Sequence, residues 1–259
     1  MNKKPIFLIG AVLATAFIGG SLFYGCSSNP ANNGPTNKPP ATTAVAATPA
    51  AIQTIPPGAP VGAEPPEQMG SPNATVTLEE FADFQCGSCA AAHPAMNEIK
   101  SIYGTRIHFI FRNYPLQIAA HDKAYEAALA ASAAGMQNKF WDMQNMLFSN
   151  QKTWSSDPTY KEIWKGYAQK IGLNMTKWET DMAGMGAKTR VEKDIERGKA
   201  ININSTPTLF LNGAAVPFTD MKVDSLKVLI DAELQKAPGQ NPAAGKEVAP
   251  AAKSDNANK

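Results

Sequence analysis

The sequence predicts an α/β sandwich with helices inserted near its middle, and three observations support this fold class. The first part of the folded region has the pattern of a strand, a helix and a second strand. The last part has the pattern of a hairpin followed by a helix, and a long alanine-rich block with helical character separates the two parts. A βαβ unit and a ββα unit with helices between them build an α/β sandwich.

The first unit begins with residues 74–84 (ATVTLEEFADF), which alternate between two faces as a strand does. One face carries four apolar residues and a single carboxylate: Val76, Leu78, Glu80, Ala82 and Phe84. Residues 87–103 then have a helical pattern, and residues 106–112 (RIHFIFR) predict the second strand.

The alanine-rich block over residues 118–200 predicts several helices. Breaks between them are expected near residues 150–158, 172–174 and 184–186. Residues 208–218 predict a hairpin, because an Asn-Gly pair, a strong turn signal, lies at their centre. A closing helix follows over residues 219–234, with Thr219 or Asp220 as its N-cap.

The composition predicts a folded domain without a nucleic-acid partner. The chain has 259 residues, of which 44% are hydrophobic and 18% charged, and its formal net charge is +2. Nucleic-acid binding would need a basic stripe rather than this near-neutral mixture. The three cysteines are an odd number, so at least one lies outside any intrachain disulfide.

The N-terminus predicts export. Two lysines precede an uncharged run of 19 residues, 6–24; as a helix it would span about 28 Å, close to the roughly 30 Å of a bilayer core. Residues 1–25 are therefore expected to be a signal peptide or an uncleaved membrane anchor. The stretch LFYGCSSN resembles the lipobox of bacterial lipoproteins, which makes Cys26 a candidate lipidation site; the alternative is that Cys26 merely ends a membrane helix. Either way, the rest of the chain would lie in the periplasm or on the outer face of the cell membrane.

The two ends of the chain predict disorder. Residues 26–67 are rich in Pro, Ala, Thr and Asn and read as an extended tether, because such a segment buries too little apolar surface to offset its ordering entropy. Residues 237–259 have the same character and predict a disordered tail. One folded domain is expected between them, over residues 68–236.

Cys86 and Cys89 lie where the strand-like run gives way to the helical one. In the first helical turn, unpaired N–H groups and the helix dipole favour a thiolate on Cys86, and Cys89 is placed to resolve a mixed disulfide. A zinc site would need a second pair of ligands, and the three histidines, His93, His108 and His121, lack a paired spacing. A purely structural disulfide across so short a ring gives little stabilisation. The pair therefore predicts a working dithiol that needs no metal.

On these residues the chain resembles the DsbA family of thioredoxin-fold thiol-disulfide oxidoreductases, and most of all its single-domain, membrane-tethered bacterial members. The resemblance covers about residues 69–234, through the phrases MGSPNATVTLEEFADF, FADFQCGSC, NKFWDMQNMLFSNQ and STPTLFLNG. It implies a thioredoxin fold with a helical domain inserted at about residues 114–200, and chemistry that requires no organic cofactor.

The resemblance also assigns roles to single residues. Pro207 corresponds to the cis-proline that faces the cysteine pair and, with Thr206, helps to hold the substrate peptide. Glu80 corresponds to the buried acid that assists proton transfer at the inner cysteine, and its apolar strand face independently predicts a raised pKa. The alternative is an edge strand that leaves Glu80 in water. Pro94 matches a proline that bends the active-site helix.

The function implied is an exported thiol-disulfide oxidoreductase with Cys86, Cys89 and Glu80 as catalytic residues, acting as a dithiol oxidase on cysteine-containing exported proteins. A redox partner in the membrane would recycle the dithiol. Gly87 and Ser88 tune the pair: they replace the Pro-His of the strongest oxidants, so Cys86 is expected to be less acidic than in those proteins. Two alternatives remain open, a reductase or isomerase of the same fold and a non-catalytic binding or chaperone lipoprotein.

Overall fold

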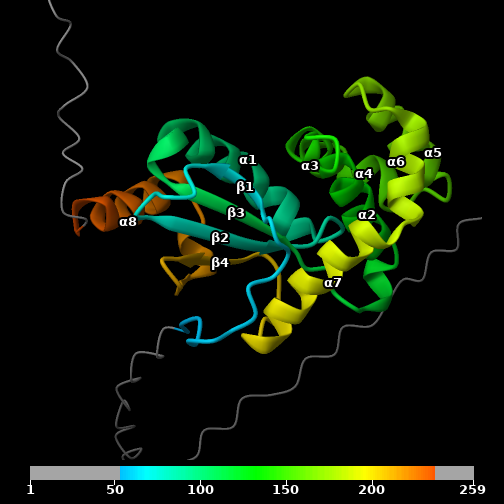
Figure 1. Ribbon diagram of the computed structural model, residues 1–259. Coiled ribbons are helices and arrows are strands. Elements are labelled where there is room, and N and C mark those ends of the chain that lie inside the picture. Colours follow the sequence, from blue (N-terminus) through cyan, green and yellow to red (C-terminus); the bar gives the residue numbers. More distant parts are fainter. Residues whose placement is uncertain (1–52, 237–259) are drawn as a thin grey trace, which may run out of the picture. The chain divides into compact units, whose positions relative to one another are not determined.

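The computed structural model describes residues 53–236, which fold around a five-stranded mixed sheet (Figure 1). The strands are β1 (Glu67–Gly70), β2 (Thr77–Ala82), β3 (His108–Asn113), β4 (Thr208–Leu211) and β5 (Ala214–Val216). The helices are α1 (Gly87–Tyr103), α2 (Ala124–Gly135), α3 (Phe140–Ser149), α4 (Gln151–Trp154), α5 (Tyr160–Lys170), α6 (Met175–Ala183), α7 (Met185–Ala200) and α8 (Val223–Lys236). This order confirms the predicted α/β class with helices inserted between β3 and β4.

The strand β2 lies at the centre of the sheet, in the spatial order β1-β3-β2-β4-β5. It runs parallel to β3 and antiparallel to β4, so Glu80 faces Phe111 on one neighbour and Leu209 on the other. The alternative of a wet edge strand is therefore wrong, and Glu80 is only 3% exposed. The predicted hairpin is also present: Asn212 and Gly213 both have positive φ angles, 48° and 81°, as a tight β4–β5 turn requires.

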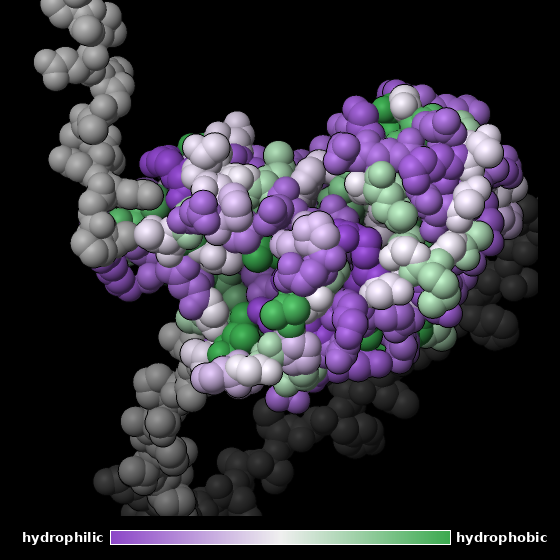
Figure 2. All heavy atoms as spheres, viewed as in Figure 1, coloured by the Kyte–Doolittle hydropathy of each residue, from purple (hydrophilic) through white to green (hydrophobic). Residues whose placement is uncertain are grey.

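The two faces of the sheet are covered by different helices. On one face α1 and α8 contact each other, and the Tyr103 hydroxyl donates to Asp231 at 2.9 Å. Figure 1 shows α7 on the opposite side of the strands, and the helices α2 to α6 grouped at the end of the sheet away from α8. In Figure 2 hydrophilic side chains cover most of the visible face of that helical group, while apolar ones appear in small separate areas.

The segment before β1 corrects one prediction. Residues 53–66 were expected to belong to a disordered tether, yet they run along the folded domain. The N–H of Ala215 in β5 donates to the Gln53 carbonyl at 2.8 Å, and the N–H of Ile55 donates to the Gly213 carbonyl at 2.8 Å. Their Pro/Ala-rich composition was misleading because the ordering comes from distant partners that composition does not reveal.

The N-cap prediction for the closing helix is also wrong, since α8 begins at Val223. The N–H of Asp220 donates to the Pro217 carbonyl at 2.9 Å, and that of Met221 donates to the Phe218 carbonyl at 3.2 Å. These bonds close a separate 3-10 turn before the helix starts.

The predictions for residues 1–25, Cys26 and residues 237–259 lie outside the part of the chain that the structure describes. Within residues 53–236, none of the helices combines the length and the apolar character that crossing a bilayer requires.

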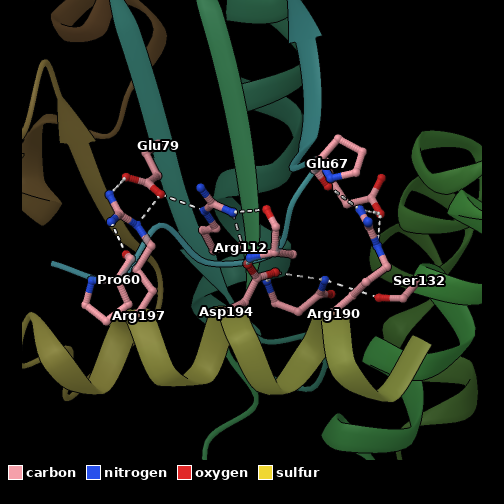
Figure 3. Close-up of polar contacts among 11 residues, drawn as sticks. Pro60, Glu67, Glu79, Arg112, Ser132, Arg190, Asp194 and Arg197 are labelled. Atoms are coloured by element: carbon pink, nitrogen blue, oxygen red, sulfur yellow. Dashed lines mark hydrogen bonds and ion pairs between the residues drawn. The ribbon is translucent and has the colours of Figure 1, made fainter. Parts of the chain in front are cut away.

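A buried network of charges joins β2, β3 and α7 beneath the sheet (Figure 3). The Glu79 carboxylate accepts from Arg112 at 2.7 Å and from both Nε and Nη2 of Arg197, at 2.8 and 2.7 Å. Arg112 also donates to Asp194 at 3.1 Å. Burial by itself would raise the pKa of Glu79, but the contacts with Arg197 and Arg112 outweigh it and hold the pKa below its ordinary value.

The same network fastens the segment before β1. Arg197 Nη1 donates to the Pro60 carbonyl at 2.6 Å, and Arg112 Nη1 donates to the Ala63 carbonyl at 3.1 Å. The Ala63 N–H in turn donates to Asp194 at 2.9 Å. Each arginine donates both to a carboxylate and to a backbone carbonyl. The same set of charges therefore holds the segment before β1 and the helix α7 to the sheet.

We expect Glu79→Gln to lower the free energy of unfolding by about 3 kcal/mol at pH 7, because the substitution leaves two buried guanidinium groups short of a counter-charge. Urea unfolding measures this loss. Since the folded-state pKa of Glu79 is depressed, its contribution is complete above the ordinary glutamate pKa of about 4.3 and is lost as the pH falls further. The two proteins should therefore converge in stability at low pH.

Glu196→Gln is the matched control, because the Glu196–Lys193 pair is 54% exposed on both sides and should contribute no more than about 0.5 kcal/mol. Equal losses for the two variants at pH 7 would contradict the role assigned to the buried network.

Candidate dithiol active site

Both cysteines of the described region lie at the N-terminal turn of α1. Cys86 is the N-cap, with an extended backbone (φ −70°, ψ 119°), and Cys89 follows in the first turn. Both are free thiols; Cys86 is 8% exposed and Cys89 is fully buried. The sulfur that an incoming thiol can reach is therefore that of Cys86.

Several donors converge on the Cys86 sulfur. The Cys89 thiol has the largest effect and, with the Thr206 side chain and the N–H groups of Cys89 and Ser88, lowers the pKa of Cys86 to about 5 although burial acts in the opposite direction. In the thiol form, Cys86 Sγ donates to the Thr206 carbonyl at 3.2 Å. The buried Thr206 hydroxyl has no other partner among residues 53–236, so it is available to donate to the sulfur once the proton has left.

The pKa of Cys89 is shifted in the opposite direction. Burial, followed by the contacts with Cys86, raises the pKa of Cys89 well above its ordinary value. One sulfur is thus stabilised as a thiolate and the other as a thiol. This asymmetry suits Cys86 to exchange with other thiols and Cys89 to hold or release a proton inside the protein.

Glu80 is the buried acid of this site. Burial raises the pKa of Glu80 to about 7, and the nearby Lys100 ammonium opposes the rise. The charge of Glu80 in turn contributes to the raised pKa of Cys89. A carboxyl group that titrates near neutral pH beside a buried thiol is suited to exchange a proton with it.

Lys100 was missed in the sequence analysis. It extends from α1 toward Glu80, its Nζ lies 4.3 Å from the centroid of the Trp141 ring, and burial lowers the pKa of Lys100 to about 8. The helical period offered a signal, because Cys89, Met96 and Lys100 follow each other at i, i+7 and i+11 on one stripe. A lysine in a stripe that is otherwise buried predicts an acidic partner.

The loop before β4 lies against the cysteine pair. The Thr206–Pro207 peptide bond is cis, as the family resemblance implies. Thr206 is 8% exposed and contacts Cys86 directly. In the antiparallel β4–β5 pair Leu209 faces Val216, and Pro207 lies directly before the first residue of β4.

The turn that leads into Cys86 is held by partners from the helical insertion, none of which the sequence analysis identified. Asp83 is 1% exposed, and its carboxylate accepts from the Leu116 N–H at 2.8 Å and from His121 Nδ1 at 2.7 Å. Gln85 accepts from the Lys123 N–H at 2.6 Å. Sequence spacing gave no signal for these contacts, because they join residues more than 30 positions apart.

The three histidines lie in different surroundings. His93 is buried, its Nε2 donates to Asn145 Oδ1 at 2.8 Å, and its ring packs against Phe148; burial lowers the pKa of His93 to about 4. His108 bonds Gln68 at 2.6 Å. Across residues 53–236, no three His, Cys, Asp or Glu side chains are grouped as metal ligands would be.

The structure thus brings together Cys86, Cys89, Glu80, Thr206 and Pro207 around one helix N-terminus in a thioredoxin-type sheet. Gly87 and Ser88 lie in the same first turn, where the Ser88 N–H, rather than its hydroxyl, contributes to the lowered pKa of Cys86. A dithiol at the start of a helix, over a buried acid and opposite a cis-proline, defines a thioredoxin-fold redox site.

Comparison with known proteins agrees with this description. A protein-family model described as thioredoxin (Thioredoxin_4) matches residues 63–232, well over half of the chain. The chain belongs to this thioredoxin family, and its fold is the DsbA-like variant with a helical insertion.

Two solved structures illustrate the shared fold. BdbD from Bacillus subtilis is 23% identical, with a TM-score of 0.58 over 67% of this chain and 97% of BdbD. The thiol-disulfide exchange protein alpha-DsbA2 from Wolbachia pipientis is 19% identical, with a TM-score of 0.55 over 65% of this chain and 87% of that protein.

Sequence relatives include a protein named Na(+)/H(+) antiporter NhaA 1 from Mycolicibacterium gilvum, 33% identical over 156 residues. The match covers 60% of this chain and 24% of the relative. The chain therefore spans about a quarter of the length of the curated relatives that it matches.

We expect Thr206→Val to raise the pKa of Cys86 by about one, because it removes a hydroxyl donor to the thiolate. Thr206→Ser keeps the hydroxyl and should leave the pKa close to that of the unmodified protein. Thiolate absorbance at 240 nm as a function of pH measures both. An unchanged pKa in Thr206→Val would show that the hydroxyl does not reach the sulfur.

Lys100→Met should raise the pKa of Glu80 above its value of about 7, since the cation that opposes the effect of burial is removed. The pH profile of thiol-disulfide exchange with a reduced peptide should then show its inflection at higher pH. Glu80→Gln should abolish that inflection, and Lys193→Met, at an exposed position, should leave it in place. A common inflection in all four proteins would mean that Glu80 does not control the proton.

Proposed function

We propose that this chain is an extracytoplasmic thiol-disulfide oxidoreductase that oxidises pairs of cysteines in exported proteins. The observation that carries the proposal is the opposite acid-base behaviour of two cysteines three residues apart: the pKa of Cys86 is lowered to about 5 and that of buried Cys89 is raised. A disulfide that only stabilised the fold would not need this difference.

The oxidation begins with the Cys86–Cys89 disulfide. A substrate thiolate attacks Sγ of Cys86, the bond between the two enzyme sulfurs breaks, and the electron pair goes to Cys89. A second thiolate of the same substrate then attacks the substrate sulfur of the mixed disulfide. The substrate leaves with a new disulfide, and Cys86 leaves as a thiolate, so two electrons have passed from substrate to enzyme.

Glu80 supplies the proton in this scheme. Cys89 is fully buried, so its thiolate is unfavourable and must be protonated as the enzyme disulfide opens. A carboxyl group with a pKa of about 7 is partly protonated at neutral pH and is suited to give that proton. When a recycling partner in the membrane reoxidises the pair, Glu80 takes the proton back.

The acidity of Cys86 supports the oxidising direction. A thiolate that is stable in the reduced enzyme makes the disulfide a stronger oxidant. A pKa of about 5 lies between the values of about 7 for thioredoxin and about 3.5 for DsbA. Gly87 and Ser88 fit this intermediate acidity, because Ser88 contributes a backbone N–H and neither residue adds a charge.

Phe218, in the 3-10 turn after β5, offers the substrate an apolar contact. At 61% exposure it is among the most exposed large apolar side chains of residues 53–236. A cysteine-containing segment of an unfolded exported protein presents apolar side chains that this ring can cover.

The chain is proposed to act at the outer side of the membrane, attached through a lipidated Cys26 or through a helix within residues 1–25. Ion transport is not proposed for it, since the match to the antiporters covers about a quarter of their length. Mass spectrometry of the mature N-terminus tests the attachment: a diacylglyceryl group on Cys26 indicates a lipoprotein, and an intact Met1 indicates a membrane anchor.

We expect the oxidised protein to convert a reduced two-cysteine peptide to its disulfide stoichiometrically, and Cys86→Ser to lose this activity by more than a thousandfold. Cys89→Ser should accumulate the mixed disulfide. The reduction potential measured against glutathione decides the direction: a value above about −250 mV supports the oxidase, and a lower one indicates a reductase instead. Full activity in Cys86→Ser would indicate a binding protein.

A further inference from the structure

One side chain from the helical insertion holds the turn in front of α1. Gln151, the first residue of α4, donates from its amide nitrogen to the Phe84 carbonyl at 2.7 Å and to the Cys86 carbonyl at 2.9 Å. It is 9% exposed, and both bonds are buried. A primary amide has two N–H donors, and here both go to the backbone on either side of Gln85.

The two carbonyls have few other partners. Among residues 53–236, Gln151 is the only donor to the Phe84 carbonyl, and the Cys86 carbonyl additionally accepts from the Ala90 N–H at 3.1 Å. Buried backbone carbonyls are almost always paired. Gln151 is therefore the partner that allows this turn to be buried in its present shape.

Holding a carbonyl also directs the neighbouring N–H. A trans peptide group is planar, so the N–H of the next residue points away from the held oxygen. The Phe84 carbonyl shows this effect: the N–H of the next residue, Gln85, donates to the Asp83 carboxylate at 2.7 Å. For the Cys86 carbonyl, the peptide group that Gln151 holds joins Cys86 to Gly87, the first residue of α1. The orientation of this peptide group therefore sets the direction of the first helical turn.

We propose that Gln151 is a positioning residue for Cys86, which keeps the first turn of α1 oriented so that its N–H groups meet the Cys86 sulfur. The inference rests on the proposed function, since it takes Cys86 as the reacting sulfur. It assigns to the helical insertion a part in tuning the dithiol, although Gln151 itself does not touch the sulfur.

Gln151 is expected to affect the Cys86 thiolate through the charge of the Cys86 carbonyl. The carbonyl oxygen of Cys86 carries partial negative charge and belongs to the same residue as the thiolate. One N–H of the Gln151 amide donates to that oxygen and counters its charge. Without this N–H the partial negative charge of the oxygen is less well compensated beside the anion, so the thiolate should be less stable.

The test compares Gln151→Met with Gln137→Met in the full chain. Methionine matches glutamine in length but carries no donor. Gln137 also bridges backbone groups inside the insertion, donating to the Asn174 carbonyl at 3.2 Å and accepting from the Asn174 N–H at 3.0 Å. The control therefore loses a comparable amide contact away from the dithiol. The readouts are the pKa of Cys86 from absorbance at 240 nm and the equilibrium constant with glutathione.

We expect Gln151→Met to raise the pKa of Cys86 by about one and to make the disulfide about tenfold less oxidising, while Gln137→Met changes neither. Gln151→Leu is the second variant, in case the first does not fold; it also removes both donors, adds no charge and should shift the pKa in the same direction. A folded variant at position 151 with an unchanged pKa and equilibrium constant overturns the proposal, even if its melting temperature falls.

The unmodified protein, measured alongside, separates this inference from the proposed function. If its Cys86 has an ordinary pKa and does not exchange with glutathione, the proposed function fails. If it is acidic and active but the variants at position 151 do not differ from it, only the role of Gln151 fails.

Discussion

The sulfur of Cys86 at the N-terminus of α1 is the point on which the rest of the site depends. A thiolate there accepts hydrogen bonds from the first helical turn, from the Cys89 thiol and from Thr206, and these donors are worth more than the cost of partial burial. These donors come from two parts of the chain. The helix α1 supplies the N–H groups and the Cys89 thiol, and the loop before β4 supplies Thr206.

The central strand β2 carries two adjacent carboxylates that face opposite sides of the sheet and behave in opposite ways. Glu79 meets two arginines beneath the sheet, so its pKa is lowered and it serves to hold α7. Glu80 faces α1 with a single lysine nearby, so burial prevails and its pKa rises to about 7. The same residue type is thus structural on one face and available for proton transfer on the other, because the number of neighbouring cations differs.

Residues of the helical insertion contact the turn before Cys86. Gln151 holds the carbonyls on both sides of Gln85, His121 pairs with Asp83, and the N–H of Lys123 meets Gln85. The turn before Cys86 is consequently held from the insertion, while Cys86 itself belongs to the thioredoxin-type unit. A change in the packing of the insertion would therefore be felt at the sulfur without any contact between them.

The sequence by itself determined the features that depend on neighbours along the chain: the alternation of residues 74–84, the dithiol at a strand-to-helix junction, the Asn-Gly hairpin, and the carboxylate on an apolar strand face. It also carried the family resemblance, and with it the pairing of the cysteines with Pro207. Only the tertiary structure decided what meets these features. Three sets of contacts join positions far apart in the chain, and local sequence patterns do not reveal them: Lys100 beside Glu80, Gln151 at the turn before Cys86, and the arginines that donate to the Pro60 and Ala63 carbonyls. The reason is physical: hydrophobic period and turn chemistry act over a few residues, whereas the burial and pairing that set a pKa are properties of the folded interior.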